Sequence, residues 1–340
     1  MNLLLDVQNI SLKFKRAGKY FTILDQVTFS VEKGETLGIV GESGCGKSMT
    51  ALSIMRLLPD NATLEGKVML ETEVITELSK KRLEKVRGNQ MSMIFQDPLT
   101  SLNPLHKVGK QIEESLLLHT NLSKKERKER AIKLLKEVGL PRAEELIEEY
   151  PHQLSGGMRQ RIMIAIAMAC QPQLLICDEP TTALDVTVQA QILELMNSLK
   201  KENDMGIIMI THDLGVVAEV CDRVMVMYAG QVVEQADVHE LFNNPHHPYT
   251  KGLLKSIPKL GSRKEQLGSI PGTVPSPQNM PSGCRFADRC SEVMDICRQK
   301  QPVTKVVSGG HSTACWLYDD KEVGPNVTVR NQKSKTAFSS

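Results

Sequence analysis

The chain has 340 residues, which at roughly 150 residues per domain suggests about two domains. Its 42 basic residues nearly balance its 40 acidic ones, and the net charge of +2 provides no general field that would attract DNA or RNA. Aromatic residues make up only 4%, which argues against a stacking platform for single-stranded nucleic acid. The longest apolar run, from Ile162 to Cys170, falls far short of the roughly 20 residues that span a membrane. The N-terminus lacks the basic start and apolar core of a signal peptide, so we expect a cytoplasmic chain.

Alternating apolar residues between positions 3 and 33 predict short strands. The apolar run 36–40 predicts a strand buried on both faces, followed by a Gly-rich turn and a helix over 48–58. Further segments have the lengths and periodicities of strands at 91–95, 174–177, 207–210 and 224–228, and of helices at 124–138, 155–170 and 189–199. Strands that alternate with helices favour an α/β fold with a parallel sheet.

The composition changes near residue 245, where prolines become frequent. Residues 246–318 therefore predict a linker or a small irregular module. The polar tail over 319–340 is expected to be disordered.

The segment Gly41–Ser48 matches the phosphate-loop pattern G-x-x-x-x-G-K-S, between a predicted strand and a predicted helix. Its glycines let successive backbone N–H groups point at a phosphate, and the helix N-terminus adds partial positive charge. Lys47 would neutralise the β- and γ-phosphates, and Ser48 would bind Mg²⁺. Cys45 is expected to contribute its backbone alone. The nucleotide-binding residues predicted here are Gly41, Glu42, Ser43, Gly44, Cys45, Gly46, Lys47, Ser48 and Met49.

Two carboxylates follow the apolar strand predicted at 174–177. Asp178 ends this strand, from where it would reach Mg²⁺. Glu179 points differently because it is one residue further on, and it is the candidate general base toward water.

Four more segments come in a characteristic order: Gln96 after a strand, Leu154–Met158 at a helix start, Ala183–Asp185 shortly after Glu179, and His212 after the strand 207–210. Together with the phosphate loop they resemble the ATP-binding-cassette ATPases over about residues 3–245. The fifth signature position is Met158, where Gln is commonest in that family, and we expect little loss of activity from this departure.

The resemblance implies an α/β P-loop NTPase with a RecA-like core, an antiparallel β subdomain and a helical subdomain. The core would comprise 1–96 and 172–245, and the helical signature subdomain 97–171. It also implies a head-to-tail dimer in which ATP lies between one phosphate loop and the partner's Ser155, Gly156 and Gly157. Gln96 would contact Mg²⁺ and water, His212 the γ-phosphate, and Asp185 the dimer interface.

In this family an upstream aromatic residue normally stacks on adenine. Phe14 is our prediction because it ends a strand-like run, and Tyr20 is the second candidate. A purely packing role for Phe14 stays open.

Three segments resemble ATPase subunits of oligopeptide and dipeptide importers: Phe95–Pro104, His247–Thr250, and 271–290 with its cysteines. This resemblance implies a second ATPase subunit, identical or paralogous, and two membrane permease subunits. It also implies an indirect link to a peptide-binding protein and a location at the cytoplasmic face of the membrane. A non-transport ATPase of DNA repair or translation is the alternative, and a redox-regulatory protein with a vestigial ATPase is a third.

Four cysteines gather near the C-terminus with the spacing C-x5-C-x6-C-x17-C, which lacks the close pairs of a zinc finger. Four thiolates suit an iron–sulfur cluster or Zn²⁺. Importer subunits of this type can carry a [4Fe-4S] cluster, so the resemblance favours that cluster over zinc, with free buried thiols third. We expect this module to be independent of the phosphate loop. The residues are Cys284, Cys290, Cys297 and Cys315.

Overall fold

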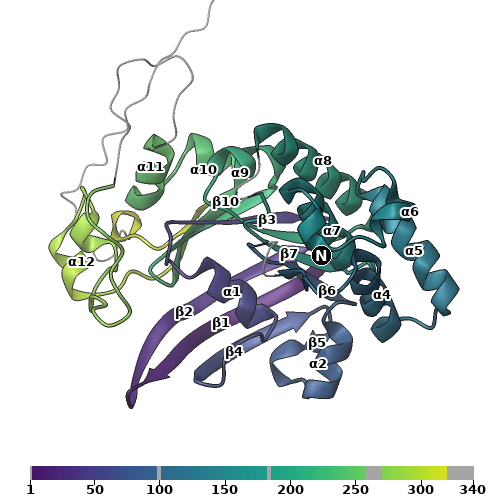
Figure 1. Cartoon of the computed structure of the whole chain (residues 1–340). Coiled ribbons are helices and arrows are strands. Elements are labelled where there is room, and N and C mark those ends of the chain that lie inside the picture. Colours follow the sequence, from purple (N-terminus) through teal and green to yellow (C-terminus); the bar gives the residue numbers. More distant parts are fainter. Residues whose placement is uncertain (1, 98–100, 182–184, 257–269, 320–340) are drawn as a thin grey trace, which may run out of the picture.

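The computed structural model describes residues 2–97, 101–181, 185–256 and 270–319, and these build two sheets with helices around them (Figure 1). The larger sheet has eight strands in the order β11-β12-β10-β9-β3-β8-β7-β6. Its parallel part contains buried strands in which almost every residue is inaccessible. These are β3 (Thr36–Val40), β6 (Met91–Ile94), β7 (Leu174–Asp178), β8 (Gly206–Ile210) and β9 (Arg223–Tyr228). The predicted α/β class and these five strands are confirmed.

The smaller sheet is antiparallel, with the order β2-β1-β4-β5. Its first two strands, β1 (Leu3–Arg16) and β2 (Lys19–Glu32), form one long hairpin where the sequence predicted several short strands. Bulges interrupt the alternation: the register shifts between Val7 and Ile10, and the backbones of Asn9 and Gln26 lie in the left-handed region. The sequence analysis missed β4 (Ala62–Leu70), β5 (Glu73–Val74) and α2 (Lys80–Val86).

A group of helices stands at one end of the larger sheet (Figure 1). The predicted helix at 124–138 is α5 (Lys124–Glu137), and Ser123 and Glu126 close its N-terminus as a capping box. The predicted helix at 155–170 is α7 (Gly156–Ala167). Two further helices, α4 (Val108–His119) and α6 (Ala143–Leu146), complete this part, and leucines and isoleucines pack between them.

The remaining helices connect or cover the strands of the larger sheet. The helix after the phosphate loop, α1 (Lys47–Ile54), ends four residues earlier than predicted, since Arg56 turns into the left-handed region. The predicted helix at 189–199 is longer, as α8 (Val186–Asn203). Shorter helices are α9 (Leu214–Val220), α10 (Val238–Asn243), α11 (Pro248–Lys255) and α12 (Asp295–Gln299). Single 3-10 turns lie at Ile75–Glu77, Pro151–Gln153, Ala287–Arg289 and Trp316–Tyr318.

The C-terminal module is continuous with the larger sheet. Its strands β11 (Lys305–Ser308) and β12 (His311–Thr313) form a hairpin, and β12 pairs with β10 (Gln231–Asp237). The module is therefore less irregular than its prolines suggested, and it extends the sheet of the ATP-binding core. The predicted disordered tail lies outside the described residues, apart from Asp319. Among the residues described, no helix is long and apolar enough to cross a membrane.

Candidate active site

The phosphate loop connects β3 to α1, as predicted. Gly41, Gly44 and Gly46 all have positive φ angles, of 151°, 79° and 110°. A Cβ atom on Gly41 would lie 2.3 Å from the carbonyl oxygen of Met227, so only glycine fits there. Lys47 is 7% exposed, and its Nζ donates to the carbonyl oxygens of Gly41 at 2.7 Å and Glu42 at 3.2 Å. The ammonium group thus lies inside the loop that would enclose a phosphate.

A pair of oxygen atoms beside the loop could hold a divalent cation. Ser48 Oγ donates to Asp178 Oδ1 at 3.1 Å, which joins the start of α1 to the end of β7. Burial raises the pKa of Asp178, and the hydrogen bond from Ser48 opposes this effect. Carboxylate and hydroxyl oxygens are the ligands that Mg²⁺ prefers, so the two residues fit the predicted metal site.

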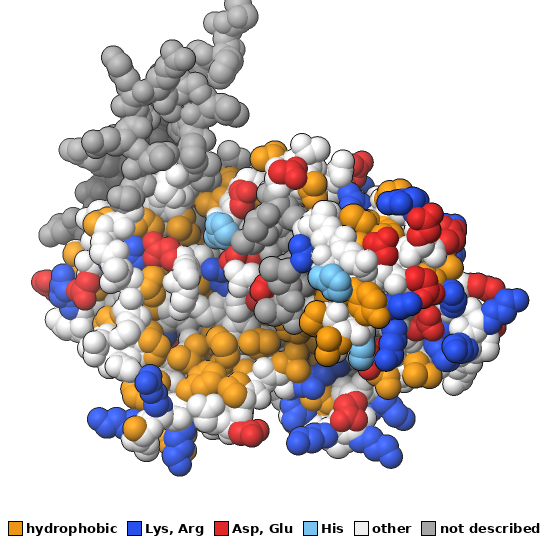
Figure 2. All heavy atoms as spheres, in the orientation of Figure 1, with side chains coloured by type: hydrophobic (Ala, Val, Ile, Leu, Met, Phe, Trp, Pro, Cys, Tyr) orange, Lys and Arg blue, Asp and Glu red, His pale blue; other side chains and the backbone are white. Residues whose placement is uncertain are grey.

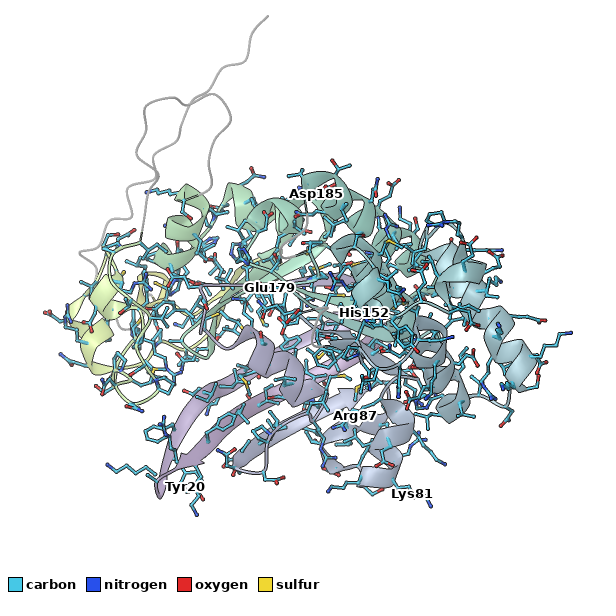
Figure 3. All side chains as sticks on the ribbon, in the orientation of Figure 1. Tyr20, Lys81, Arg87, His152, Glu179 and Asp185 are labelled. Atoms are coloured by element: carbon cyan, nitrogen blue, oxygen red, sulfur yellow. The ribbon has the colours of Figure 1, made fainter. Side chains whose placement is uncertain are left out.

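Three predicted residues from different segments meet at the ends of the parallel strands. Gln96 Nε2 donates to Glu179 Oε2 at 3.0 Å, and His212 Nδ1 lies 3.4 Å from Glu179 Oε1. Glu179 has a φ of 50°, and its N–H donates to the carbonyl oxygen of Ile210, so its direction differs from that of Asp178. Figure 3 places Glu179 near the centre of the molecule. A carboxylate held between an amide and an imidazole can orient and deprotonate a water molecule.

The signature residues lie at the N-terminus of α7. Ser155 caps α7, its Oγ accepting from the N–H of Met158 at 3.3 Å, and both Ser155 and Gly156 are exposed. A Cβ on Gly156 would meet nothing within 4 Å, while one on Gly157 would lie 3.1 Å from Val188. This open helix N-terminus is suited to receive an anion from outside the chain.

Asp185 lies at the start of α8, where its side chain accepts from the N–H of Val188 at 2.9 Å. It is exposed, and the next residue, Val186, is 84% exposed. Figure 3 shows Asp185 at the upper surface. Ala183 and Leu184 of the same predicted segment lie outside the described residues.

The two residues predicted to stack on adenine, Phe14 and Tyr20, differ in their surroundings. Phe14 is half-buried, faces Phe21 in the hairpin, and packs against the core of the antiparallel sheet. Tyr20 is 59% exposed at the hairpin tip, far from Glu179 (Figure 3). Either could stack on adenine, so that assignment stays a prediction.

Two other residues of the phosphate loop pack inward. Cys45 is buried, and burial raises the pKa of its thiol. This agrees with the expected backbone role for Cys45. Met49 packs against the same hydrophobic cluster as a partly buried side chain.

The C-terminal module binds Glu42, the second residue of the phosphate loop. The sequence analysis did not predict this contact. Arg289 donates from Nη1 to Glu42 Oε2 at 2.6 Å and from Nη2 to Oε1 at 2.9 Å. The Arg289 side chain is only 6% exposed. Tyr249 in α11 accepts the N–H of Glu42 at 2.8 Å. Two planar, charge-assisted bonds and a backbone bond therefore hold the start of the phosphate loop.

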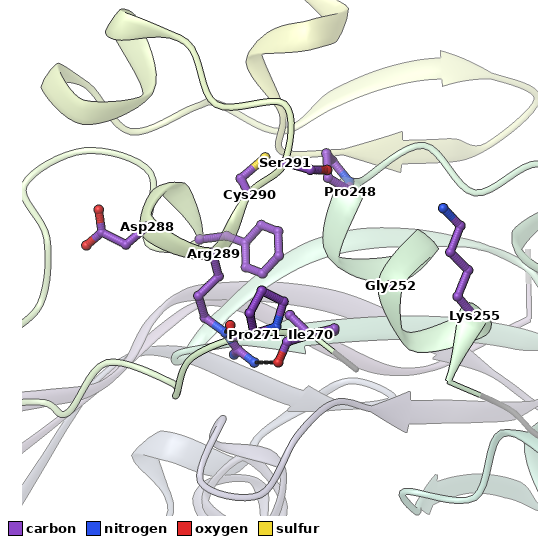
Figure 4. A pocket seen from close by; sticks show the side chains of 10 residues that line it. Pro248, Gly252, Lys255, Ile270, Pro271, Asp288, Arg289, Cys290 and Ser291 are labelled. Atoms are coloured by element: carbon purple, nitrogen blue, oxygen red, sulfur yellow. Dashed lines mark hydrogen bonds between the residues drawn. The ribbon is translucent and has the colours of Figure 1, made fainter. Parts of the chain in front are cut away.

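Arg289 is itself held within the module. Its Nε donates to the carbonyl oxygen of Pro271 at 2.8 Å and its Nη2 to that of Ile270 at 3.2 Å (Figure 4). Arg289 and the neighbouring Cys290 both line a pocket of roughly 340 Å³. The cysteine module therefore contacts the phosphate loop through Arg289, which the sequence analysis did not predict. No local pattern could have shown this pairing, since Glu42 and Arg289 are 247 positions apart.

Replacing Arg289 with Ala should weaken ATP binding, because it leaves the Glu42 carboxylate without its cation beside the triphosphate. We expect a loss of about 1.5–3 kcal/mol, or roughly 10–150-fold in Kd, measured by titration calorimetry. Glu42→Gln in the same chain should recover part of it. The control is Arg298→Ala, whose ion pair with Asp288 is exposed. Equal ATP affinity in the Arg289 and Arg298 variants would contradict the role of Arg289.

The four C-terminal cysteines are neighbours in the structure. Burial, together with the other three thiols, raises the pKa of Cys315 to about 12. Burial likewise raises the pKa of Cys284 to about 11, with Cys297 and Cys290 as neighbours. Within the described residues, no three of the sulfur atoms lie within 4.8 Å of one another.

Comparisons with known proteins show the family of this chain. A family model for "ABC transporter" matches residues 24–182, and one for "Oligopeptide/dipeptide transporter, C-terminal region" matches residues 233–297. The oligopeptide transport ATP-binding protein AppD of Bacillus subtilis is 51% identical over 323 residues, covering 94% of this chain and 98% of AppD. OppD of the same organism is 50% identical over 339 residues, covering 98% and 95%.

A solved structure is similar as well. The dimeric ATP-binding cassette MJ0796, in a post-hydrolysis state bound to ADP and Pi, superposes with a TM-score of 0.63 at 29% identity. The match covers 69% of this chain and 99% of the cassette. The chain therefore belongs to the ABC-transporter ATPases, in the group that carries the C-terminal region of oligopeptide and dipeptide transporters.

Proposed function

We propose that this chain is the ATP-hydrolysing motor subunit of a peptide importer. The observation that carries the proposal is the assembly of Gln96, Glu179 and His212 next to the Ser48–Asp178 pair. These side chains come from separate segments, and together they supply a metal site, a base and a group for the γ-phosphate. The relatives that match over nearly the whole chain are named for oligopeptide transport.

The proposed reaction is the hydrolysis of ATP to ADP and phosphate. Backbone N–H groups of the loop and Lys47 would hold the β- and γ-phosphates. When bound, Mg²⁺ would neutralise developing charge, with Ser48, Asp178 and Gln96 as its protein neighbours. Glu179 would take a proton from the attacking water, and His212 would hold the γ-phosphate.

The site is proposed to be completed by a second ATPase subunit, either a paralogue or another copy. Ser155, Gly156 and Asp185 are exposed, as a head-to-tail arrangement requires. The similar cassette MJ0796 is itself described as dimeric. Each dimer would then contain two ATP sites at its interface.

Docking to two membrane permease subunits is proposed for the region around Gln96 and the helical subdomain. Several large apolar side chains are exposed there, among them Phe95 at 42% and Leu105 at 81%. On the face shown in Figure 2, acidic and basic side chains are intermixed over the helices, which disfavours a nucleic-acid partner. The chain would lie at the cytoplasmic face of the membrane and affect a peptide-binding protein only indirectly.

Purification of the tagged chain from membranes in mild detergent tests this function. We expect permease chains and a second ATPase chain to co-purify, and Glu179→Gln with ATP to increase the yield of the closed complex. Co-purification with DNA or ribosomes instead would favour the alternative, a non-transport ATPase.

We also propose that Cys284, Cys290, Cys297 and Cys315 bind one metal centre, with a [4Fe-4S] cluster ranked above Zn²⁺. The four-sulfur donor set and the neighbouring thiols support a single centre, and the resemblance to importer subunits ranks the cluster first. Protein purified without oxygen should be brown and contain about four irons per chain.

Cys290→Ser should abolish this metal content, whereas Cys170→Ser, in the helical part, should leave it unchanged. Because Cys290 adjoins Arg289, the Cys290 variant should also reduce ATP affinity. Metal analysis that finds neither iron nor zinc in the anaerobic protein would leave only free thiols.

A further inference from the structure

A second group of metal-ligating side chains lies outside the cysteine set and the ATP site. Glu234 is in β10, His246 precedes α11, and His311 begins β12. All three are buried, at 1%, 7% and 1% exposure. Three separate segments of the chain thus bring two imidazoles and a carboxylate together at one buried point.

The three facing atoms have the separations of ligands around one ion. His311 Nε2 lies 2.7 Å from Glu234 Oε1, His246 Nδ1 lies 3.1 Å from His311 Nε2, and His246 Nδ1 lies 3.7 Å from Glu234 Oε1. A circle through atoms so spaced has a radius of about 1.9 Å, just under the Zn–N and Zn–O lengths of about 2.0–2.2 Å. An ion slightly out of their plane would therefore reach all three at ordinary bond lengths.

Backbone hydrogen bonds hold the Glu234 carboxylate, and a second carboxylate lies near the His311 ring. The N–H groups of His246 and His247 donate to the two oxygens of Glu234, at 2.5 and 3.0 Å. On the far side of the His311 ring, Nδ1 lies 3.8 Å from a carboxylate oxygen of Glu240. A carboxylate behind the second nitrogen is the usual support of a metal-bound histidine.

Either a cation or a proton could lie between the three facing atoms, and the two arrangements differ in the number of protons on His311. If a neutral His311 donates from Nε2 to Glu234, its buried Nδ1 has no proton and faces the Glu240 carboxylate without a hydrogen bond. With a cation between the three atoms, Nε2 offers its lone pair and Nδ1 carries the proton toward Glu240. A doubly protonated His311, which leaves His246 Nδ1 as an acceptor, is the competing arrangement.

We propose that Glu234, His246 and His311 bind a zinc ion that ties β12 and the segment before α11 to β10. Two imidazoles and one carboxylate are borderline donors of the kind zinc takes, and a fourth position would be left for water. The site is buried and joins three segments of the chain, so its role is structural. This zinc ion would be separate from the metal centre proposed for the four cysteines.

The test compares the full-length, untagged protein with two matched variants. His246→Asn removes one ligand, and His239→Asn makes the same change at an exposed position in α10. After chelation and titration with Zn²⁺, the wild type and the His239 variant should bind one more equivalent per chain than the His246 variant. Zinc should also raise the Tm of the first two proteins by more than it raises the Tm of the His246→Asn variant.

A third variant keeps the test decisive if His246→Asn fails to fold. His246→Cys keeps a ligand, so with Co²⁺ it should retain the extra equivalent and add a thiolate charge-transfer band beyond that of the four native cysteines. Equal metal content in the wild type and the His246→Asn variant would overturn the proposal. So would a His246→Cys protein without the added band, since His311 would then be held by a proton.

Discussion

Glu179→Gln should bind ATP with normal affinity and hydrolyse it about 10²–10⁴-fold more slowly, the range that a general base contributes. The amide keeps the shape of the side chain and can still accept the hydrogen bond that Gln96 donates at 3.0 Å. It cannot take a proton from water. Single-turnover hydrolysis with the native partner present measures the effect, and trapped ATP should favour the closed dimer.

Glu194→Gln on the exposed side of α8 makes the same chemical change away from the site and should be silent. Hydrolysis at a near-normal rate in the Glu179 variant would show that another group deprotonates the water. Loss of ATP binding in that variant would instead point to a structural role for the carboxylate.

Lys47→Ala should weaken nucleotide binding itself. The ammonium group lies inside the loop, bound to the carbonyl oxygens of Gly41 and Glu42, and it is the side-chain cation placed to meet the phosphates. Losing one charge-assisted contact costs about 3 kcal/mol, roughly 150-fold in Kd. Titration calorimetry with ATP and Mg²⁺ measures it.

Lys125→Ala is the control, because that side chain is 88% exposed on α5. An unchanged Kd for Lys47→Ala would mean that the phosphate loop has been assigned wrongly. A change that vanishes when ADP replaces ATP would restrict the lysine to the γ-phosphate.

Contiguous features were the most predictable from the sequence. The phosphate loop is one run of eight positions whose glycines and lysine each have a local reason, so its place between β3 and α1 followed directly. The strands β7 and β8 were equally clear, because they are buried on both faces and read as uninterrupted apolar runs. The encounter of Gln96 and Glu179 required the family resemblance, since 83 positions separate them.

Features that depend on backbone exceptions or distant pairs were not predictable. Asn9 and Gln26 break the alternation of the hairpin by adopting left-handed conformations. The type of a single residue does not predict such a conformation. The ion pair of Glu42 with Arg289 and the meeting of Glu234 with His311 each join segments that only the folded sheet brings together. Charged residues and histidines of this kind are ordinary at exposed positions, so their types gave no sign of these contacts.

The pairing of β12 with β10 has a consequence for how the protein is made. A ribosome must synthesise residues 311–313 before β10 gains its second neighbour, so until then β10 is the edge strand of the sheet that carries the phosphate loop. An open edge offers unpaired backbone groups to other chains. Nascent or truncated chains that end before β12 should therefore aggregate through β10, which the hairpin of the peptide-transporter module covers in the complete chain.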